Sequence, residues 1–156
     1  MERFNQIPDS EFVFGALFVV ANKMDTLLER TLSKHNVTSK QWFLLLVLFN
    51  LFEKPPTIKE VSKEIGSSHQ NIKQVALKLE EKGMLKLEKD KKDLRATRLI
   101  LTEKSYEFWK TIENDGREFM DAFYYGIEND NMRNIRHFMS SLMLNLNEME
   151  TKEDTK

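Results

Sequence analysis

The stretch from Thr57 to Thr102 constrains the fold most, because two short helical patterns are followed there by two strand patterns. Thr57 and Glu60 have the spacing of a capping box, which begins a helix. Gly66 ends this helix and Gly83 ends a second one, since glycine adopts the left-handed conformation at little cost. Apolar residues recur every three or four positions, namely Ile58, Val61 and Ile65, then Ile72, Val75, Ala76 and Leu79. The pattern predicts a helix-turn-helix.

A two-stranded ribbon follows the helix pair. Apolar and polar residues alternate over residues 85–88 and 97–101, which is the period of a half-buried strand. The segment from Lys89 to Arg95 has one uncharged residue, Leu94, so we expect the whole segment to project as an exposed hairpin tip. A basic hairpin directly after a helix-turn-helix makes a winged helix, and the predicted fold class is mainly α.

Three motifs in this region occur in a characteristic order. They are Ile65-Gly66-Ser67-Ser68, the run from Leu79 to Leu85, and Asp93-Leu94-Arg95 with Leu99, Leu101 and Thr102. Together they resemble the MarR family of bacterial winged-helix regulators. The family pattern in the wing is Asp, any residue, Arg, three residues, an aliphatic residue, any residue and Leu-Thr, and each position is met. Val37-Thr38 with Gln41 and Trp42 resembles the family's second helix.

The second helix of the motif and the wing supply candidate DNA-binding residues. Asn and Gln can pair with adenine in the major groove, and Lys can bind guanine or phosphate. The candidates are Ser67, Ser68, His69, Gln70, Asn71, Lys73, Gln74 and Lys78, with Lys89, Lys91, Lys92, Asp93 and Arg95 in the wing. The alternative is a solvated polar helix face. This alternative is disfavoured because the helix follows a helix-turn and precedes a wing. MarR relatives usually carry Arg where Gln74 stands and a small hydroxyl residue where Lys73 stands, so the resemblance does not supply the operator sequence.

The wing residues have distinct expected roles. The resemblance implies that Arg95 enters the minor groove, where a planar and permanently charged guanidinium is favoured. We expect Asp93 to accept a bidentate pair from the Arg95 side chain and so to orient it. The three wing lysines would meet flanking phosphates without reading sequence.

Charge is segregated along the chain. The 156 residues have a net charge of −1, but residues 54–104 carry +5 and the remainder −6. The positive charge therefore coincides with the winged helix, as a DNA-binding surface requires. The best alternative is a winged-helix module that binds protein and not DNA, which predicts an uncharged or acidic wing and recognition face.

The flanking segments are expected to be long helices. One runs from about Asp9 to Lys34, after a loose arm, and others run from Thr38 to about Leu51, from Thr102 to about Tyr125, and onward from a cap at Asp130. The helix after Thr38 is apolar all round and should be the buried centre.

The first and last helices carry apolar residues on more than one side, which predicts burial against a second copy of the chain. The resemblance implies that these helices interlock into a homodimer. Two recognition helices on a two-fold axis would read a pseudo-palindromic operator in double-stranded DNA. The predicted organisation is a dimerisation helix at 1–36, the winged helix-turn-helix at 37–102 and dimerisation helices at 103–156.

An effector pocket is a further implication of the resemblance. Phe18, Trp42, Tyr106 and Trp109 could line a pocket for a small apolar or aromatic ligand, although aromatic residues at helical spacing are more often core. The chain has no cysteine, which excludes thiol-based sensing, and it has no histidine–carboxylate cluster for zinc. We expect no metal and no cofactor.

No motif of catalysis or membrane insertion is present. The chain has no His-Glu-x-x-His, phosphate-binding glycine loop or nucleophile elbow, and His35, His69 and His137 fall in three separate elements. No membrane-length apolar stretch or signal peptide is visible, so we expect a cytoplasmic location. The prediction is a homodimeric transcriptional repressor, not an enzyme, that a small ligand releases from DNA.

Overall fold

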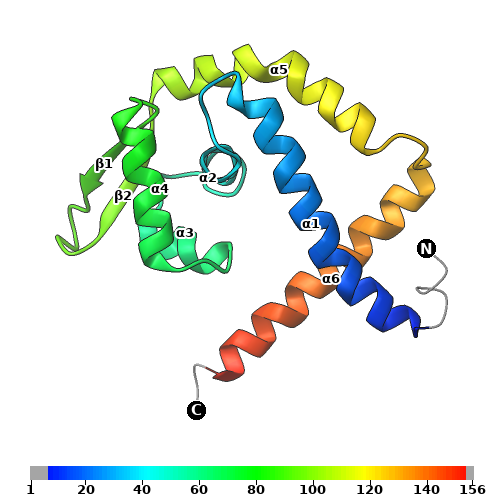
Figure 1. Cartoon of the computed structure of the whole chain (residues 1–156). Coiled ribbons are helices and arrows are strands. Elements are labelled where there is room, and N and C mark those ends of the chain that lie inside the picture. Colours follow the sequence, from blue (N-terminus) through cyan, green and yellow to red (C-terminus); the bar gives the residue numbers. More distant parts are fainter. Residues whose placement is uncertain (1–6, 154–156) are drawn as a thin grey trace. The chain divides into compact units, whose positions relative to one another are not determined.

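A computed structural model describes residues 7–153. The described part contains the helices α1 (Asp9–Ser33), α2 (Ser39–Asn50), α3 (Ile58–Glu64), α4 (His69–Glu81), α5 (Glu103–Phe123) and α6 (Asn129–Glu153), and the strands β1 (Leu85–Lys89) and β2 (Thr97–Leu101) (Figure 1). The predicted mainly α fold with a two-stranded wing is confirmed. Most of the arm expected at the N-terminus lies outside the described residues.

The helix starts follow the predicted capping chemistry. At α3, Glu60 N donates to Thr57 Oγ1 at 3.2 Å and Thr57 N donates to Glu60 Oε2 at 2.6 Å. The same reciprocal pair joins Thr38 and Gln41 at the start of α2. These bonds satisfy backbone N–H groups that have no partner inside a helix.

Gly66 has a φ of +62°, which allows the chain to turn sharply from α3 into α4.

The α6 boundaries differ from the prediction. The helix begins at Asn129, so Asp130 lies in its first turn and is not the cap. The side chain of Asp130 accepts a hydrogen bond from Arg133, one turn along the same face. The helix continues to Glu153, and a 3.9 Å ion pair joins Lys152 to Glu148 in its last turns.

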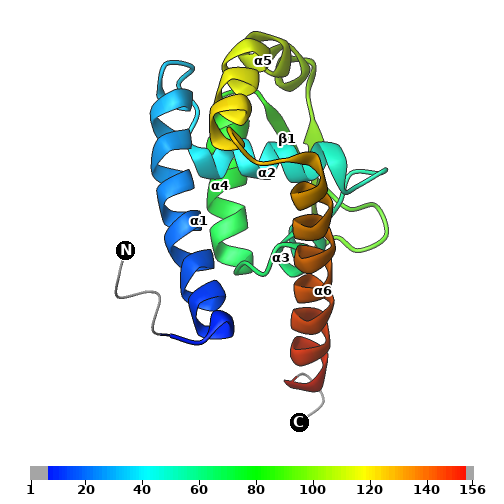
Figure 2. The same cartoon turned by 90° about the vertical axis from the view of Figure 1, so that its right-hand side faces the viewer.

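α2 lies at the centre of the hydrophobic core. It lies crosswise between α1 and α4, as the two perpendicular views show (Figures 1 and 2). Its inner residues Leu44, Leu45, Val47 and Leu48 are buried against the apolar faces of the helix-turn-helix, which include Val61, Ile72, Ala76 and Leu79. α2 is not buried all round, because Phe43 is 45% exposed.

The wing is an antiparallel hairpin that joins the segment before α3. Leu85 pairs with Leu101 and Leu87 pairs with Leu99. Leu99 N also donates to Pro56 O at 2.8 Å, and Thr57 forms an isolated bridge with Arg98. The hairpin is therefore fixed to the first residues of the helix-turn-helix as well as to the end of α4.

The chain divides into two compact units, the first ending at Phe119 and the second beginning at Met120. In the first unit, α1 leaves much apolar surface uncovered at Phe12, Phe14, Phe18, Val19, Val20, Met24 and Leu27. In the second, α6 does the same at Ile135, Phe138, Met139, Met143, Leu144, Leu146 and Met149. Between residues 7 and 153, no helix is long and apolar enough to span a membrane.

Candidate nucleic-acid interface

α4 presents a polar face opposite its buried one. Ile72, Ala76 and Leu79 point into the core, as their spacing predicts. The candidate residues His69, Gln70, Asn71, Lys73, Gln74 and Lys78 are all exposed. α4 therefore has the division between an anchored side and an accessible polar side that a recognition helix needs.

The turn before α4 orients one of these side chains. Ser68 Oγ accepts a hydrogen bond from Asn71 N at 3.1 Å, which makes Ser68 the N-cap of α4. The Asn71 side-chain amide donates to Ser67 Oγ at 2.9 Å. Ser67 is half-buried and holds Asn71 in place, so both serines have a structural role at the start of α4.

The wing tip exposes all five of its predicted candidates. Lys89, Lys91, Lys92, Asp93 and Arg95 are all exposed, and Leu94 beside Arg95 is 74% exposed. The tip is closed by two backbone bonds, from Asp90 N to Ala96 O at 3.1 Å and from Ala96 N to Asp93 O at 2.9 Å. The lysines and Arg95 are thus accessible on a folded loop.

Two expectations for the tip are wrong. Asp93 accepts the backbone N–H of Arg95 at 3.0 Å, so its carboxylate shapes the turn and forms no described ion pair with the Arg95 guanidinium. Asp90 is not exposed with the rest of the tip, since only 7% of it is accessible. The local charge density suggested exposure, but hydrogen bonds from neighbouring amides and a cross-strand arginine allow this carboxylate to be buried.

Asp90 and Arg98 form a pair that the sequence analysis did not predict. Asp90 Oδ1 accepts Lys92 N and Asp93 N, each at 2.8 Å, and Asp90 Oδ2 accepts from Arg98 Nε. The two amides and the Arg98 guanidinium lower the pKa of Asp90 to about 2. Only the strand register brings the two residues together, because it places Arg98 opposite Glu88, two residues before Asp90.

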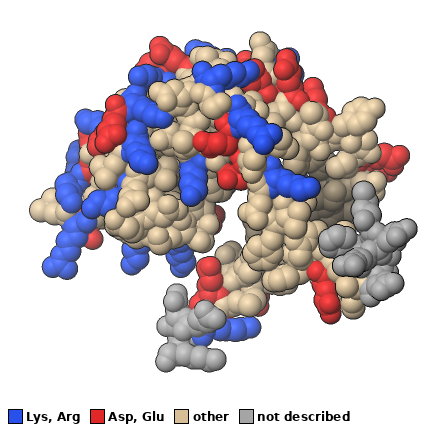
Figure 3. Space-filling view, in the orientation of Figure 1, with Lys and Arg blue, Asp and Glu red and all other residues tan. Residues whose placement is uncertain are grey.

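Cationic side chains gather over the helix-turn-helix and wing. Figure 3 shows many of the Lys and Arg side chains on the α4 and wing side of this face, interspersed with acidic residues. The excess of positive charge in residues 54–104 is therefore displayed at the surface, where it raises the local electrostatic potential.

The expected effector residues separate into two groups. Trp42 and Trp109 have ring centroids 6.2 Å apart, and Phe49 contacts both Trp109, at 5.3 Å, and Tyr106, at 4.9 Å. Phe18 packs instead on Phe14, along exposed α1. The structure thus brings three of the four aromatic residues into one cluster, joined by Phe49.

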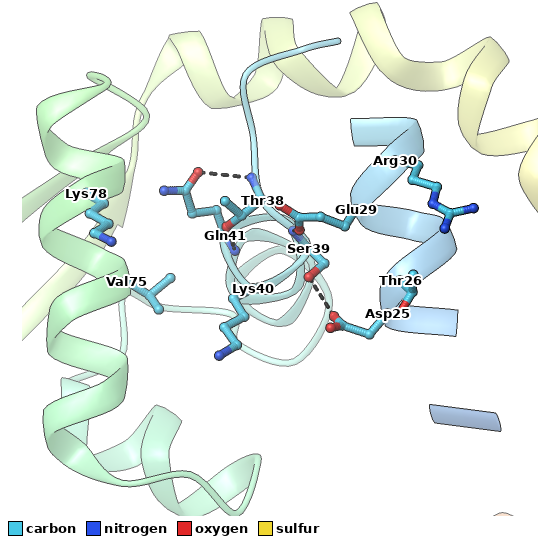
Figure 4. Close-up of a pocket in the computed structure, with 10 residues that line it drawn as sticks. All are labelled: Asp25, Thr26, Glu29, Arg30, Thr38, Ser39, Lys40, Gln41, Val75 and Lys78. Atoms are coloured by element: carbon cyan, nitrogen blue, oxygen red, sulfur yellow. Dashed lines mark hydrogen bonds between the residues drawn. The ribbon is translucent and has the colours of Figure 1, made fainter. Parts of the chain in front are cut away.

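A hollow of about 570 Å³ lies elsewhere, between α1, the start of α2 and α4 (Figure 4). Its two carboxylates are both engaged by Ser39, which donates its amide to Glu29 Oε2 at 2.5 Å and its hydroxyl to Asp25 Oδ1 at 2.6 Å. These bonds fasten α1 to the N-terminus of α2. The hollow is lined by Asp25, Thr26, Glu29, Arg30, Thr38, Ser39, Lys40, Gln41, Val75 and Lys78, and contains none of the predicted aromatic residues.

In the part of the chain that the structure describes, no group of three or more His, Asp or Glu side chains is placed to hold a metal ion. His69 and His137 are exposed, whereas His35 pairs with Asp115.

No family model matches the sequence. Solved structures of similar fold cover most of the chain. A MarR transcriptional regulator from Methanosarcina mazei Go1 has a TM-score of 0.79 and 18% identity over 89% of this chain and 99% of its own. A MarR protein from Peptoclostridium difficile has a TM-score of 0.79 and 16% identity over 94% of each chain.

The S. aureus MepR–DNA complex has a TM-score of 0.74 and 13% identity, over 90% of this chain and 99% of its own. Identities this low establish architecture and not activity. The chain has the MarR-type winged-helix fold, as the motifs in the turn and wing predicted.

Proposed function

We propose that the protein is a homodimeric, sequence-specific DNA-binding repressor. The observation that carries this proposal is α4, which is anchored by buried Ile72, Ala76 and Leu79 and exposes a face of amide and lysine side chains. In each subunit α4 lies in the major groove, and Asn71, Lys73 and Gln74 contact bases and phosphates. Arg95 enters the neighbouring minor groove, and the wing lysines bind the backbone.

Homodimerisation supplies the second recognition helix. The exposed apolar side chains along α1 and along α6 support this step, because large apolar side chains gathered on one helix mark an interaction site. A two-fold axis makes the operator pseudo-palindromic, with half-sites about one helical turn apart. Fold similarity to the S. aureus MepR–DNA complex supports the same mode of binding.

Release by a small apolar or aromatic ligand completes the proposed function. The cluster of Trp42, Tyr106 and Trp109 supports it, because the indole Nε1 of Trp109 is buried without a hydrogen-bond partner among the described residues. A buried N–H donor in that position costs free energy that a ligand oxygen can recover. A ligand there would contact both α2 and α5, which precede and follow the α3–α4 pair and the wing in sequence.

The test is selection of DNA by the purified protein from sheared genomic fragments, followed by sequencing. The proposal predicts enrichment of a pseudo-palindrome upstream of genes, with affinity that falls as salt rises. A winged-helix module that binds protein predicts no enriched sequence. A dimer that retains only random fragments would refute sequence-specific binding.

A further inference from the structure

The wing is connected to the helix-turn-helix by a continuous series of hydrogen bonds that runs through Asp90 and Arg98. The series begins at the tip, where the amides of Lys92 and Asp93 both donate to Asp90 Oδ1 at 2.8 Å. It crosses the hairpin where Arg98 Nε donates to Asp90 Oδ2. One carboxylate therefore accepts hydrogen bonds from the loop and from the opposite strand.

Arg98 continues the series to the other side of the hairpin. A second nitrogen of its guanidinium, Nη1, donates to Pro55 O at 2.5 Å. Pro55 lies two residues before Thr57, the N-cap of α3. The planar guanidinium fixes both directions at once, because its donors are held in a rigid fork. The orientation of the tip is thereby set relative to the start of the helix-turn-helix.

Burial explains why this pair differs from an ordinary surface ion pair. Asp90 is 7% exposed, whereas the side chains of the wing pair Lys86 and Glu88 are 65% and 43% exposed. A buried carboxylate with three hydrogen-bond donors has one favourable geometry, whereas an exposed pair samples many. Arg95 itself is exposed, and its amide is bonded to Asp93, which belongs to the turn that Asp90 organises.

We propose that Asp90 and Arg98 are positioning residues for DNA recognition, which hold the wing tip so that Arg95 meets the minor groove. This inference rests on the proposed function and deepens it. Neither residue needs to touch DNA. The pair reduces the freedom of the tip before binding, so that less ordering is required when the complex forms.

The test uses Asp90→Asn, which changes one carboxylate into an amide of the same size. The amide cannot accept on both sides, so the link between the tip and Arg98 is broken. The substitution also removes a negative charge, which by electrostatics alone would tighten binding to every DNA. If Asp90 positions the wing tip, the substitution should instead weaken binding to the selected sequence. The measurement is fluorescence anisotropy with a duplex that the wild-type protein selects from a randomised pool, and with a random duplex.

We expect Asp90→Asn to weaken binding to the selected duplex on the order of tenfold, with binding to random DNA unchanged or tighter. The double variant Asp90→Asn/Arg95→Ala should bind the selected duplex as Arg95→Ala does, since Asp90 acts through Arg95. Glu88→Gln is the matched control, because it removes a negative charge from the wing whose ion-pair partner is Lys86 and not Arg98, and it should not weaken selected binding.

Thermal unfolding and light scattering are used to check that each variant folds and assembles as the wild type does. Should Asp90→Asn fail to fold, Arg98→Lys replaces it under the same criteria, since an ammonium keeps the charge and loses the fork. Selected binding equal to that of wild type, or losses that multiply in the double variant, would overturn the inference while leaving DNA binding intact. Failure of the wild type to select any duplex would instead refute the proposed function, and this inference with it.

Discussion

His35 Nε2 lies 2.5 Å from Asp115 Oδ2, which joins the turn between α1 and α2 to α5 across 80 residues of chain. The other oxygen of the same carboxylate accepts Lys34 Nζ at 2.7 Å. On the far side of this turn, Lys82 Nζ from the end of α4 donates to Asn36 O and, at 2.8 Å, to Gln41 Oε1. The turn is thus held from two sides.

The Asp115 cluster predicts a pH dependence of stability. Hydrogen bonds from Lys34, which has the larger effect, and from His35 hold the pKa of Asp115 below its ordinary 3.8. The carboxylate then stabilises the folded state above pH 3.8, and this stabilisation is lost as pH falls further. The difference in free energy of unfolding between wild type and Asp115→Asn should therefore shrink below that pH. Glu113→Gln, on exposed α5 surface, is the control, and an equal pH dependence of both variants would contradict the assignment.

The packing of α4 predicts that two nearby leucines contribute unequally to the stability of the fold. Leu79 is fully buried and Leu77 is 41% exposed. Leu79→Ala leaves a cavity and should lower the free energy of unfolding by about 2–5 kcal/mol. Leu77→Ala should lower it by well under half of that. Urea unfolding monitored by circular dichroism measures both. Similar losses would show that α4 is packed differently.

Assembly can be tested with residues that are exposed in the single chain. Leu144 and Leu146 on α6 are 65% and 56% exposed, so Leu144→Glu/Leu146→Glu does not disturb the chain's own core. Wild type should scatter light as a particle of about twice 18.5 kDa, and the double variant should dissociate or unfold. Glu150→Lys is a control for charge on the same helix. A folded wild-type monomer at micromolar concentration would refute the dimer.

Tryptophan fluorescence reports on the proposed effector site, because Trp42 and Trp109 are the chain's two tryptophans and both lie in the aromatic cluster. Aromatic carboxylic acids should quench the emission and weaken DNA binding in parallel. Coupling is reciprocal, so bound DNA must lower ligand affinity by the same factor. Quenching that never accompanies DNA release would favour a plain structural core.

Local chemistry made the elements predictable. The capping boxes at Thr38 and Thr57, the glycine at Gly66 and the strand alternation each depend on residues a few positions apart, and each is observed. The exposed α4 residues followed from the same periodicity. These features needed no knowledge of tertiary structure.

Long-range pairs were not predictable in this way. Asp115 meets His35 across 80 residues, and no spacing rule connects them. Asp90 was expected to be exposed because its neighbours are charged, but the register of β2 supplies Arg98 as its partner. For Asp93, local reasoning chose the nearest cation, whereas the backbone amide of Arg95 is the partner. The partners of Asp115 and Asp90 therefore depend on tertiary placement, whereas that of Asp93 is a backbone amide two residues along the chain.

The central claim, that the polar face of α4 reads DNA, is tested most directly by comparing Lys73→Ala with Lys110→Ala. Each removes one exposed positive charge, from α4 and from α5 respectively. The measurement is the affinity of each variant for the duplex that the wild type selects, at two salt concentrations. Lys73→Ala should lose about 1–3 kcal/mol of binding free energy, and Lys110→Ala should match wild type. If Lys73→Ala binds that duplex as tightly as Lys110→Ala does, α4 is not the recognition helix.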